Sequence, residues 1–196
     1  MQTIFVRHGE LNGEDPNILH GANDPVSLSE KGRNTMTALS LVLGKMDVGV
    51  IVSSPEIRTK ESAEIIARKL SIPTQYIDEL QGRKWGDFSG KSWSEVSKIL
   101  SDKTLEERYE FTPPNGESWK QFESRMLATV RTVSQDFIKN NVCIVSHGSS
   151  IRVLLPKIFG IPVAESLKLY PGYGSISEVE YDGQNYINPL FNQIVV

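Results

Sequence analysis

The sequence predicts a single α/β domain with a largely parallel central sheet. Short apolar runs at 3–6, 48–52 and 142–145 alternate with segments of helical periodicity, and this alternation is typical of parallel sheets. The chain has 196 residues and contains no internal repeat or low-complexity linker. That length suits one hydrophobic core better than two, so we expect one domain over 1–196.

The first half of the chain predicts two strand–helix units and a third strand. After the first strand, Ser29 can cap a helix that runs towards Gly44. One face of that helix carries Met36, Leu39 and Leu43. The strand at 48–52 precedes a helix that follows Pro55, a residue suited to a first helical turn. The apolar face of this second helix carries Ala63, Ile66 and Leu70. A third strand is expected at 73–77.

The second half predicts a loop, two helices and a hairpin. The charged segment 102–115 reads as a surface loop with a helical turn, and a long helix starts near Glu117. Its buried side carries Trp119, Phe122, Met126, Val130, Val133 and Phe137. The third apolar run precedes a helix with a matching face formed by Ile151, Leu154 and Ile158. Residues 174–181 and 184–187 flank Asp182–Gly183, a strong hairpin signal.

Composition and charge exclude several classes of protein. Acidic residues number 24 and basic residues 21, so the chain lacks the basic field that binds a nucleic-acid backbone. A single cysteine, Cys143, cannot form an internal disulfide. No apolar run approaches the roughly 18 residues of a membrane span, and the N-terminus has no signal-peptide pattern. We therefore expect a cytoplasmic protein that binds neither nucleic acid nor membrane.

Polar residues follow three of the predicted strands. Arg7 and His8 follow the first, Arg58 lies just beyond the second, and His147 follows the last. Ligands of such sheets bind where the strands end, so these side chains are expected to meet. Arginine matches the oxygens of a phosphate, and a neutral imidazole is a competent nucleophile. The pattern favours a phosphoryl site with His8 as nucleophile, although each histidine could also only satisfy local hydrogen bonds.

Other site chemistries find less support in the sequence. A metal site needs three or four ligands, and the two histidines have arginines rather than carboxylates near them. The chain contains neither a Gly-x-Ser-x-Gly segment nor a phosphate-binding Gly-x-x-x-x-Gly-Lys-Ser/Thr loop. We therefore expect no metal and no other cofactor.

Five segments, in order along the chain, resemble the histidine phosphatase superfamily, the phosphoglycerate mutase-like family, branch 1. They are Arg7–Glu10, 24–33, 53–59, 114–119, and 145–148 with Arg152. The resemblance covers nearly the whole chain. It implies a three-layer α/β/α sandwich with a mostly parallel central sheet.

The resemblance also implies roles for individual residues. His8 would form a phosphohistidine, and Arg7, Arg58 and His147 would complete the phosphate pocket. Positions that contact substrate in related phosphatases correspond to Gly148, Ser149, Arg152, Trp93 and Trp119. For the two tryptophans, packing in the core is an equally good interpretation.

One position departs from the family pattern. The family carries a glutamate in Leu-x-Glu-x-x-x-Gly-x-x-x-Gly, which protonates the leaving oxygen. Here Leu80, Gly86 and Gly90 align, and Gly82 occupies the place of the acid. General acids contribute about 10² to 10⁴ in rate. Candidate replacements are Glu79, Glu10, Glu117 and Asp87. We expect Gly82→Glu to raise turnover of alkyl phosphates.

Three functions remain open at this point. The favoured one is a metal-independent phosphomonoesterase that works through phosphohistidine on a small phosphorylated substrate. The second is a phosphoglycerate mutase-type isomerase, but the mutases carry Ser and Asn where this chain has Leu11 and Glu14. The third, suggested by Gly82, is a weakly active relative that binds phosphorylated ligands or phosphate. Small members of this fold are monomers or homodimers, and either state is compatible with the sequence.

Overall fold

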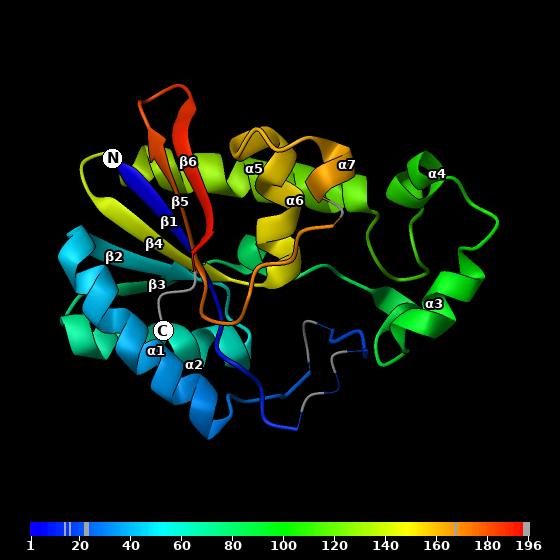
Figure 1. The fold of residues 1–196 in the computed structure, drawn as a ribbon, viewed down its shortest axis with the longest axis horizontal. Helices are drawn as coiled ribbons and strands as arrows, with labels where there is room; N and C mark the ends of the chain where they lie inside the picture. Colours follow the sequence, from blue (N-terminus) through cyan, green and yellow to red (C-terminus); the bar gives the residue numbers. More distant parts are fainter. Residues whose placement is uncertain (14, 16, 22–23, 167, 194–196) are drawn as a thin grey trace.

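A six-stranded sheet forms the centre of the protein in the computed structural model, which describes residues 1–13, 15, 17–21, 24–166 and 168–193 (Figure 1). Its strand order is β3-β2-β4-β1-β5-β6. The strands are β1 (Gln2–Arg7), β2 (Val48–Ser53), β3 (Thr74–Tyr76), β4 (Asn141–Ser146), β5 (Ile176–Tyr181) and β6 (Tyr186–Gln193). The first four are mutually parallel, and β5 and β6 add antiparallel at one edge. The prediction of a mostly parallel sheet is confirmed.

Helices cover both faces of the sheet and complete the three layers (Figure 1). One face packs against α1 (Glu30–Leu43) and α2 (Ile57–Leu70), and the other packs against α5 (Trp119–Asp136) and α6 (Gly148–Ile158). Residues of β1 alternate between the two cores: Phe5 joins the α5–α6 side, while Ile4 and Val6 join the α1–α2 side. Because both faces of the central strands are covered, β1, β2 and β4 are mostly apolar, as the sequence indicated, whereas the edge strand β3 is polar and largely exposed.

Three short helices lie outside this sandwich. They are α3 (Trp93–Ile99), α4 (Leu105–Glu110) and α7 (Val163–Ser166), of which α3 and α4 stand apart on one side (Figure 1). The expected surface loop at 102–115 contains α4 as its helical turn. The sequence analysis did not anticipate α3, although Ser92 and Glu95 form a capping box at its start.

Helix ends follow the expected capping in part. Ser29 accepts the backbone N–H of Gly32 at 3.0 Å and starts α1, as predicted. The helix predicted after Pro55 is confirmed as α2, which begins at Ile57, so that Pro55 lies just before the helix and not inside its first turn. Glu56 is the N-cap residue, with an extended backbone (φ −63°, ψ 144°). This places the Glu56 side chain at the end of β2, where its orientation bears on the site.

The C-terminal hairpin is longer than expected. Its second strand was predicted at 184–187, yet β6 runs to Gln193. Asn188 and Asn192 have positive φ angles, and the register with β5 shifts twice. These irregularities and Pro189 interrupt the alternation that reveals a strand in a sequence.

Glu14, one of the two positions that distinguish this chain from the mutases, lies outside the described residues.

Within the described part of the chain, no helix is long and apolar enough to cross a membrane. In the same residues, no three side chains of the His, Cys, Asp and Glu types come together as a metal-binding group.

Candidate active site

His8 and His147 meet at the carboxyl edge of the sheet. Strands β1 and β4 pair in parallel with Arg7 opposite Ser146, so the two histidines that follow are neighbours. Their ring centroids lie 5.5 Å apart. Both residues are nearly inaccessible, with 4% exposure each. The structure therefore brings together the two strand ends that the sequence singled out.

A glycine pair fixes the loop that carries His8. A Cβ atom at Gly9 would lie 2.7 Å from the backbone oxygen of Gly32, and one at Gly32 would lie 2.3 Å from that of Glu10. No larger residue allows this approach, because backbone cannot rotate away as a side chain can. The segment after β1 thus packs directly on the first turn of α1.

His8 is oriented for attack through Nε2. Its Nδ1 lies 2.9 Å from the carbonyl oxygen of Gly9, which can only accept a hydrogen bond. Nδ1 therefore carries the proton of the neutral ring, and Nε2 holds the lone pair. Burial, followed by the charges of Arg7, His147 and Arg58, holds the pKa of His8 well below its ordinary value. The ring is neutral at neutral pH, which is the form that can act as a nucleophile.

Two arginines present buried donors beside these rings. Arg7 donates from Nη1 to the carbonyl oxygen of Pro171 at 2.8 Å, and its guanidinium lies 3.6 Å from the ring centroid of Tyr173 and 4.8 Å from that of Tyr170. Among the described residues, Nε of Arg7 and Nη1 of Arg58 are buried without a hydrogen-bond partner. Unpaired buried donors of this kind are costly, and an anion in the pocket would satisfy both.

The hydrogen bonds of His147 define its tautomer. Arg58 donates from Nε to Nδ1 of His147 at 3.2 Å, so Nδ1 holds the lone pair and Nε2 carries the proton. Nε2 donates its proton in a close contact with the carboxylate of Glu56 and lies 3.0 Å from Oγ of Ser54. Burial lowers the pKa of His147, while the charge of Glu56 opposes that effect.

Glu56 is the site residue that the sequence analysis missed. Its side chain is 1% exposed. Besides His147, its carboxylate accepts hydrogen bonds from Arg58 Nη2 at 3.0 Å, Ser54 Oγ at 2.9 Å and the backbone N–H of Gly82 at 3.3 Å. Burial raises the pKa of Glu56, but these cationic and hydrogen-bonding partners outweigh burial and hold the pKa below its ordinary value. The sequence signal that could have revealed Glu56 is its position between the end of β2 and Arg58.

Gly82 faces the same histidine. A Cβ atom at this position would lie 3.4 Å from Cγ of His147 and 3.6 Å from Oε1 of Glu56, both ordinary contact distances. Position 82 therefore borders the ring of His147. The Glu56 carboxylate, which comes from the start of α2, reaches the same space beside the His147 ring.

The four acids proposed from the sequence lie elsewhere. Glu79 and Asp87 are exposed. Glu10 binds a lysine of α1 at the surface, and Glu117 pairs with Arg125 at 2.5 Å. Among the described contacts, none joins these carboxylates to either histidine of the site.

The predicted substrate-contacting residues fall into two groups. Gly148 and Ser149 open α6 directly after His147, where backbone N–H groups and the helix dipole favour an anion, and Arg152 lies half-buried one turn further on. Trp93 and Trp119 instead pack edge-to-face against Trp85, with ring centroids 5.8 Å and 5.7 Å away.

The tryptophan cluster surrounds a buried arginine next to Gly82. The guanidinium carbon of Arg83 lies 4.3 Å from the ring of Trp85 and 4.4 Å from that of Trp119. Burial lowers the pKa of Arg83 to about 10. Trp119 is half-buried in this cluster, whereas Trp93 is 45% exposed at its edge.

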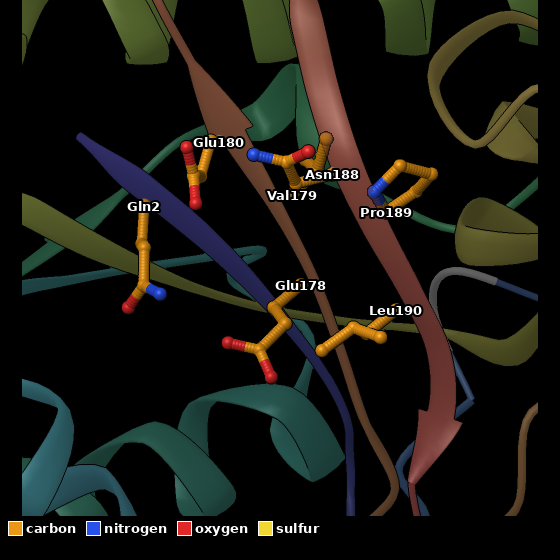
Figure 2. A pocket seen from close by; sticks show the side chains of 7 residues that line it. All are labelled: Gln2, Glu178, Val179, Glu180, Asn188, Pro189 and Leu190. Carbon is orange, nitrogen blue, oxygen red and sulfur yellow. The ribbon is translucent and has the colours of Figure 1, made fainter.

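A separate hollow lies at the opposite end of β1 (Figure 2). It is lined by Gln2, Glu178, Val179, Glu180, Asn188, Pro189 and Leu190. Of these described lining residues, two are glutamates and none is basic. The hollow therefore disfavours a phosphate, in contrast to the arginine-lined edge of the sheet.

Comparison with known proteins agrees with this geometry. A family model described as the histidine phosphatase superfamily (branch 1) matches residues 3–193. The uncharacterized phosphatase PhoE of Bacillus subtilis is 29% identical over 156 residues, which span 80% of this chain and 76% of that protein. Fructose-2,6-bisphosphatase TIGAR of Xenopus laevis is 32% identical over 152 residues, covering 76% of this chain and 52% of the relative. Phosphoglycerate mutases also match.

Solved structures share the whole fold. Bacillus stearothermophilus YhfR superposes with a TM-score of 0.85 at 24% identity, covering 98% of this chain and 97% of the other. This similarity supports the fold.

Proposed function

The chain belongs to the histidine phosphatase superfamily (branch 1), and we propose that it is a phosphomonoesterase that forms a phosphohistidine on His8 without a metal ion. One observation carries the proposal. A buried, neutral His8 with its lone pair on Nε2 lies beside Arg7 and Arg58, which each hold a buried donor without a partner among the described residues. This arrangement combines a nucleophile with a receptor for a phosphoryl group.

The reaction proceeds by two in-line transfers. In the first, Nε2 of His8 attacks phosphorus, the bond from phosphorus to the leaving oxygen breaks, and that oxygen takes up a proton. In the second, water attacks the phosphohistidine, the P–N bond breaks, and inorganic phosphate leaves. Arg7, Arg58 and the N-terminus of α6 offset the charge on the phosphoryl oxygens in both steps.

Hydrolysis of p-nitrophenyl phosphate in excess chelator tests the proposal. We expect the wild-type protein to release phosphate and His8→Ala to lose that activity by at least about 10³-fold. His20→Ala is the matched control, because His20 pairs with Asp24 outside the site and its loss should leave turnover unchanged.

Three other outcomes would contradict the proposal. Turnover that survives His8→Ala would exclude the nucleophile. Turnover that requires a metal ion would exclude the metal-independent reaction. Isomerisation of phosphoglycerate without release of phosphate would indicate a mutase.

A further inference from the structure

The mechanism above leaves one buried charged group of the site without a role, the carboxylate of Glu56. As the N-cap residue of α2, Glu56 could accept a hydrogen bond from the free N–H groups of that helix, yet it makes no capping bond. Its side chain turns into the site, where it contacts His147, Arg58, Ser54 and the backbone of Gly82. Among the described residues, it is the only carboxylate bonded to either histidine.

The first transfer needs a proton donor when the leaving group is basic. An alkoxide leaves phosphorus poorly, and a positioned acid removes that barrier by protonating the oxygen as the bond breaks. The arginines hold their protons too tightly for this role, and Nε2 of His8 is consumed by the attack on phosphorus. A carboxyl group at the edge of the phosphoryl pocket has the required chemistry.

Glycine at position 82 leaves room for the leaving group beside Glu56. An atom at the Cβ position of Gly82 would make ordinary contacts with the ring of His147 at 3.4 Å and with Oε1 of Glu56 at 3.6 Å. A substrate atom can occupy that space, while a side chain at position 82 would fill it. Oε1 is the oxygen that faces this space, and its described partner is Arg58.

Substrate binding changes the charge balance around Glu56. At rest, the Arg58 guanidinium offsets its negative charge, and the neutral His147 ring contacts it through Nε2. A phosphate monoester brings up to about two further negative charges to the same guanidinium group. Two anions sharing Arg58 repel each other, so one proton is drawn to the Glu56–His147 pair as the substrate binds.

We propose that Glu56 protonates the leaving oxygen of the substrate and so acts as the general acid of this active site. The inference rests on the proposed function. In the first transfer the carboxyl proton moves to the oxygen released from phosphorus, which leaves Glu56 as the anion. In the second transfer Glu56 takes a proton from the attacking water, whose oxygen bonds to phosphorus, and the cycle closes.

The test compares two leaving groups in Glu56→Gln, a variant that keeps the shape of the side chain. We expect kcat/KM for glycerol phosphate to fall by about 10² to 10⁴ and kcat/KM for p-nitrophenyl phosphate to fall by less than about tenfold. The difference arises because p-nitrophenolate leaves without a proton. Ser54→Ala is the matched control, since it removes a hydrogen-bond partner of His147 and Glu56 but keeps the carboxyl group, and should affect both substrates equally.

A double variant guards against simple damage to the site. We expect Glu56→Gln with Gly82→Glu to recover glycerol phosphate turnover at least about tenfold over Glu56→Gln alone, because the carboxyl group returns beside His147. Gly82→Glu alone should bring little gain. This single variant would place its new carboxylate beside that of Glu56, so the gain in alkyl phosphate turnover should be smaller than the sequence alone predicts.

Several outcomes would overturn the inference. They are an equal loss on both substrates, no loss on glycerol phosphate, a wild type that hydrolyses only p-nitrophenyl phosphate, and a double variant without recovery. Each of them leaves the phosphohistidine reaction standing. Failure of that reaction would instead appear as p-nitrophenyl phosphate turnover that is absent from the wild type or independent of His8.

Discussion

Replacing Arg58 with lysine should weaken phosphate binding in a protein that still folds. The Arg58 guanidinium donates from Nε to His147 and from Nη2 to Glu56, while Nη1 has no partner among the described residues. Lysine keeps the charge but has a single nitrogen, which can stay with Glu56 and cannot also reach the phosphate. The variant therefore loses about one charge-assisted hydrogen bond to the ligand, worth about 1.5–3 kcal/mol. That free energy corresponds to phosphate affinity about 10- to 150-fold lower.

Calorimetric titration with inorganic phosphate, together with urea unfolding, measures both quantities. The free energy of unfolding without phosphate should fall by about 1–3 kcal/mol, because Nδ1 of His147 loses its Nε donor, while the lost Nη1 has no partner among the described residues. Arg33→Lys is the control, since Arg33 pairs through Nε with Glu61 at the surface and its replacement should leave phosphate affinity unchanged. Wild-type phosphate affinity in folded Arg58→Lys would refute the assignment of Arg58 as a phosphate donor.

Four further predictions concern the surroundings of the nucleophile. The kcat/KM for p-nitrophenyl phosphate should stay constant as pH falls through 6.5 and drop only at lower pH, because the pKa of His8 lies well below that value; a drop centred near pH 6.5 would contradict this. The lowered pKa of His8 also predicts that the free energy of unfolding falls in acid, because below pH 6.5 the unfolded chain binds a proton that folded His8 does not. Urea unfolding at a series of pH values measures this loss. Gly32→Ala should lower the free energy of unfolding by about 1–3 kcal/mol, because its Cβ would lie 2.3 Å from the backbone oxygen of Glu10; unchanged unfolding in urea would contradict that packing. Tyr173→Leu should raise KM for p-nitrophenyl phosphate several-fold while Tyr173→Phe does not, because the ring holds the Arg7 guanidinium at 3.6 Å; equal KM values in the two variants would contradict this role.

The sequence predicts the main strands of the parallel sheet and the positions of their ends for a simple physical reason. Strands covered on both faces are continuous apolar runs, so the first charged residues after each run mark the carboxyl edge. Arg7, His8 and His147 stand at such points, and Arg58 lies one helical turn beyond another. The pattern of apolar runs therefore marked the positions of all four residues, and the structure brings them together.

Glu56 and the two tyrosines beside Arg7 required coordinates. The direction of the Glu56 side chain depends on its extended N-cap backbone, and an N-cap residue ordinarily turns to its own helix. Tyr170 and Tyr173 lie in an irregular segment after α7, where no period of 2 or 3.6 links sequence to contact. Such side chains are placed by tertiary packing alone.

The central claim is that a phosphoryl group is transferred to His8. Its most direct test is to mix the protein with p-nitrophenyl phosphate, quench within one turnover, and locate the phosphoryl group by peptide mass spectrometry under conditions that preserve phosphohistidine. The account predicts phosphate on the peptide that contains His8 and none on the peptide that contains His147. Phosphate on His147, or turnover with no phosphorylated peptide, would contradict it.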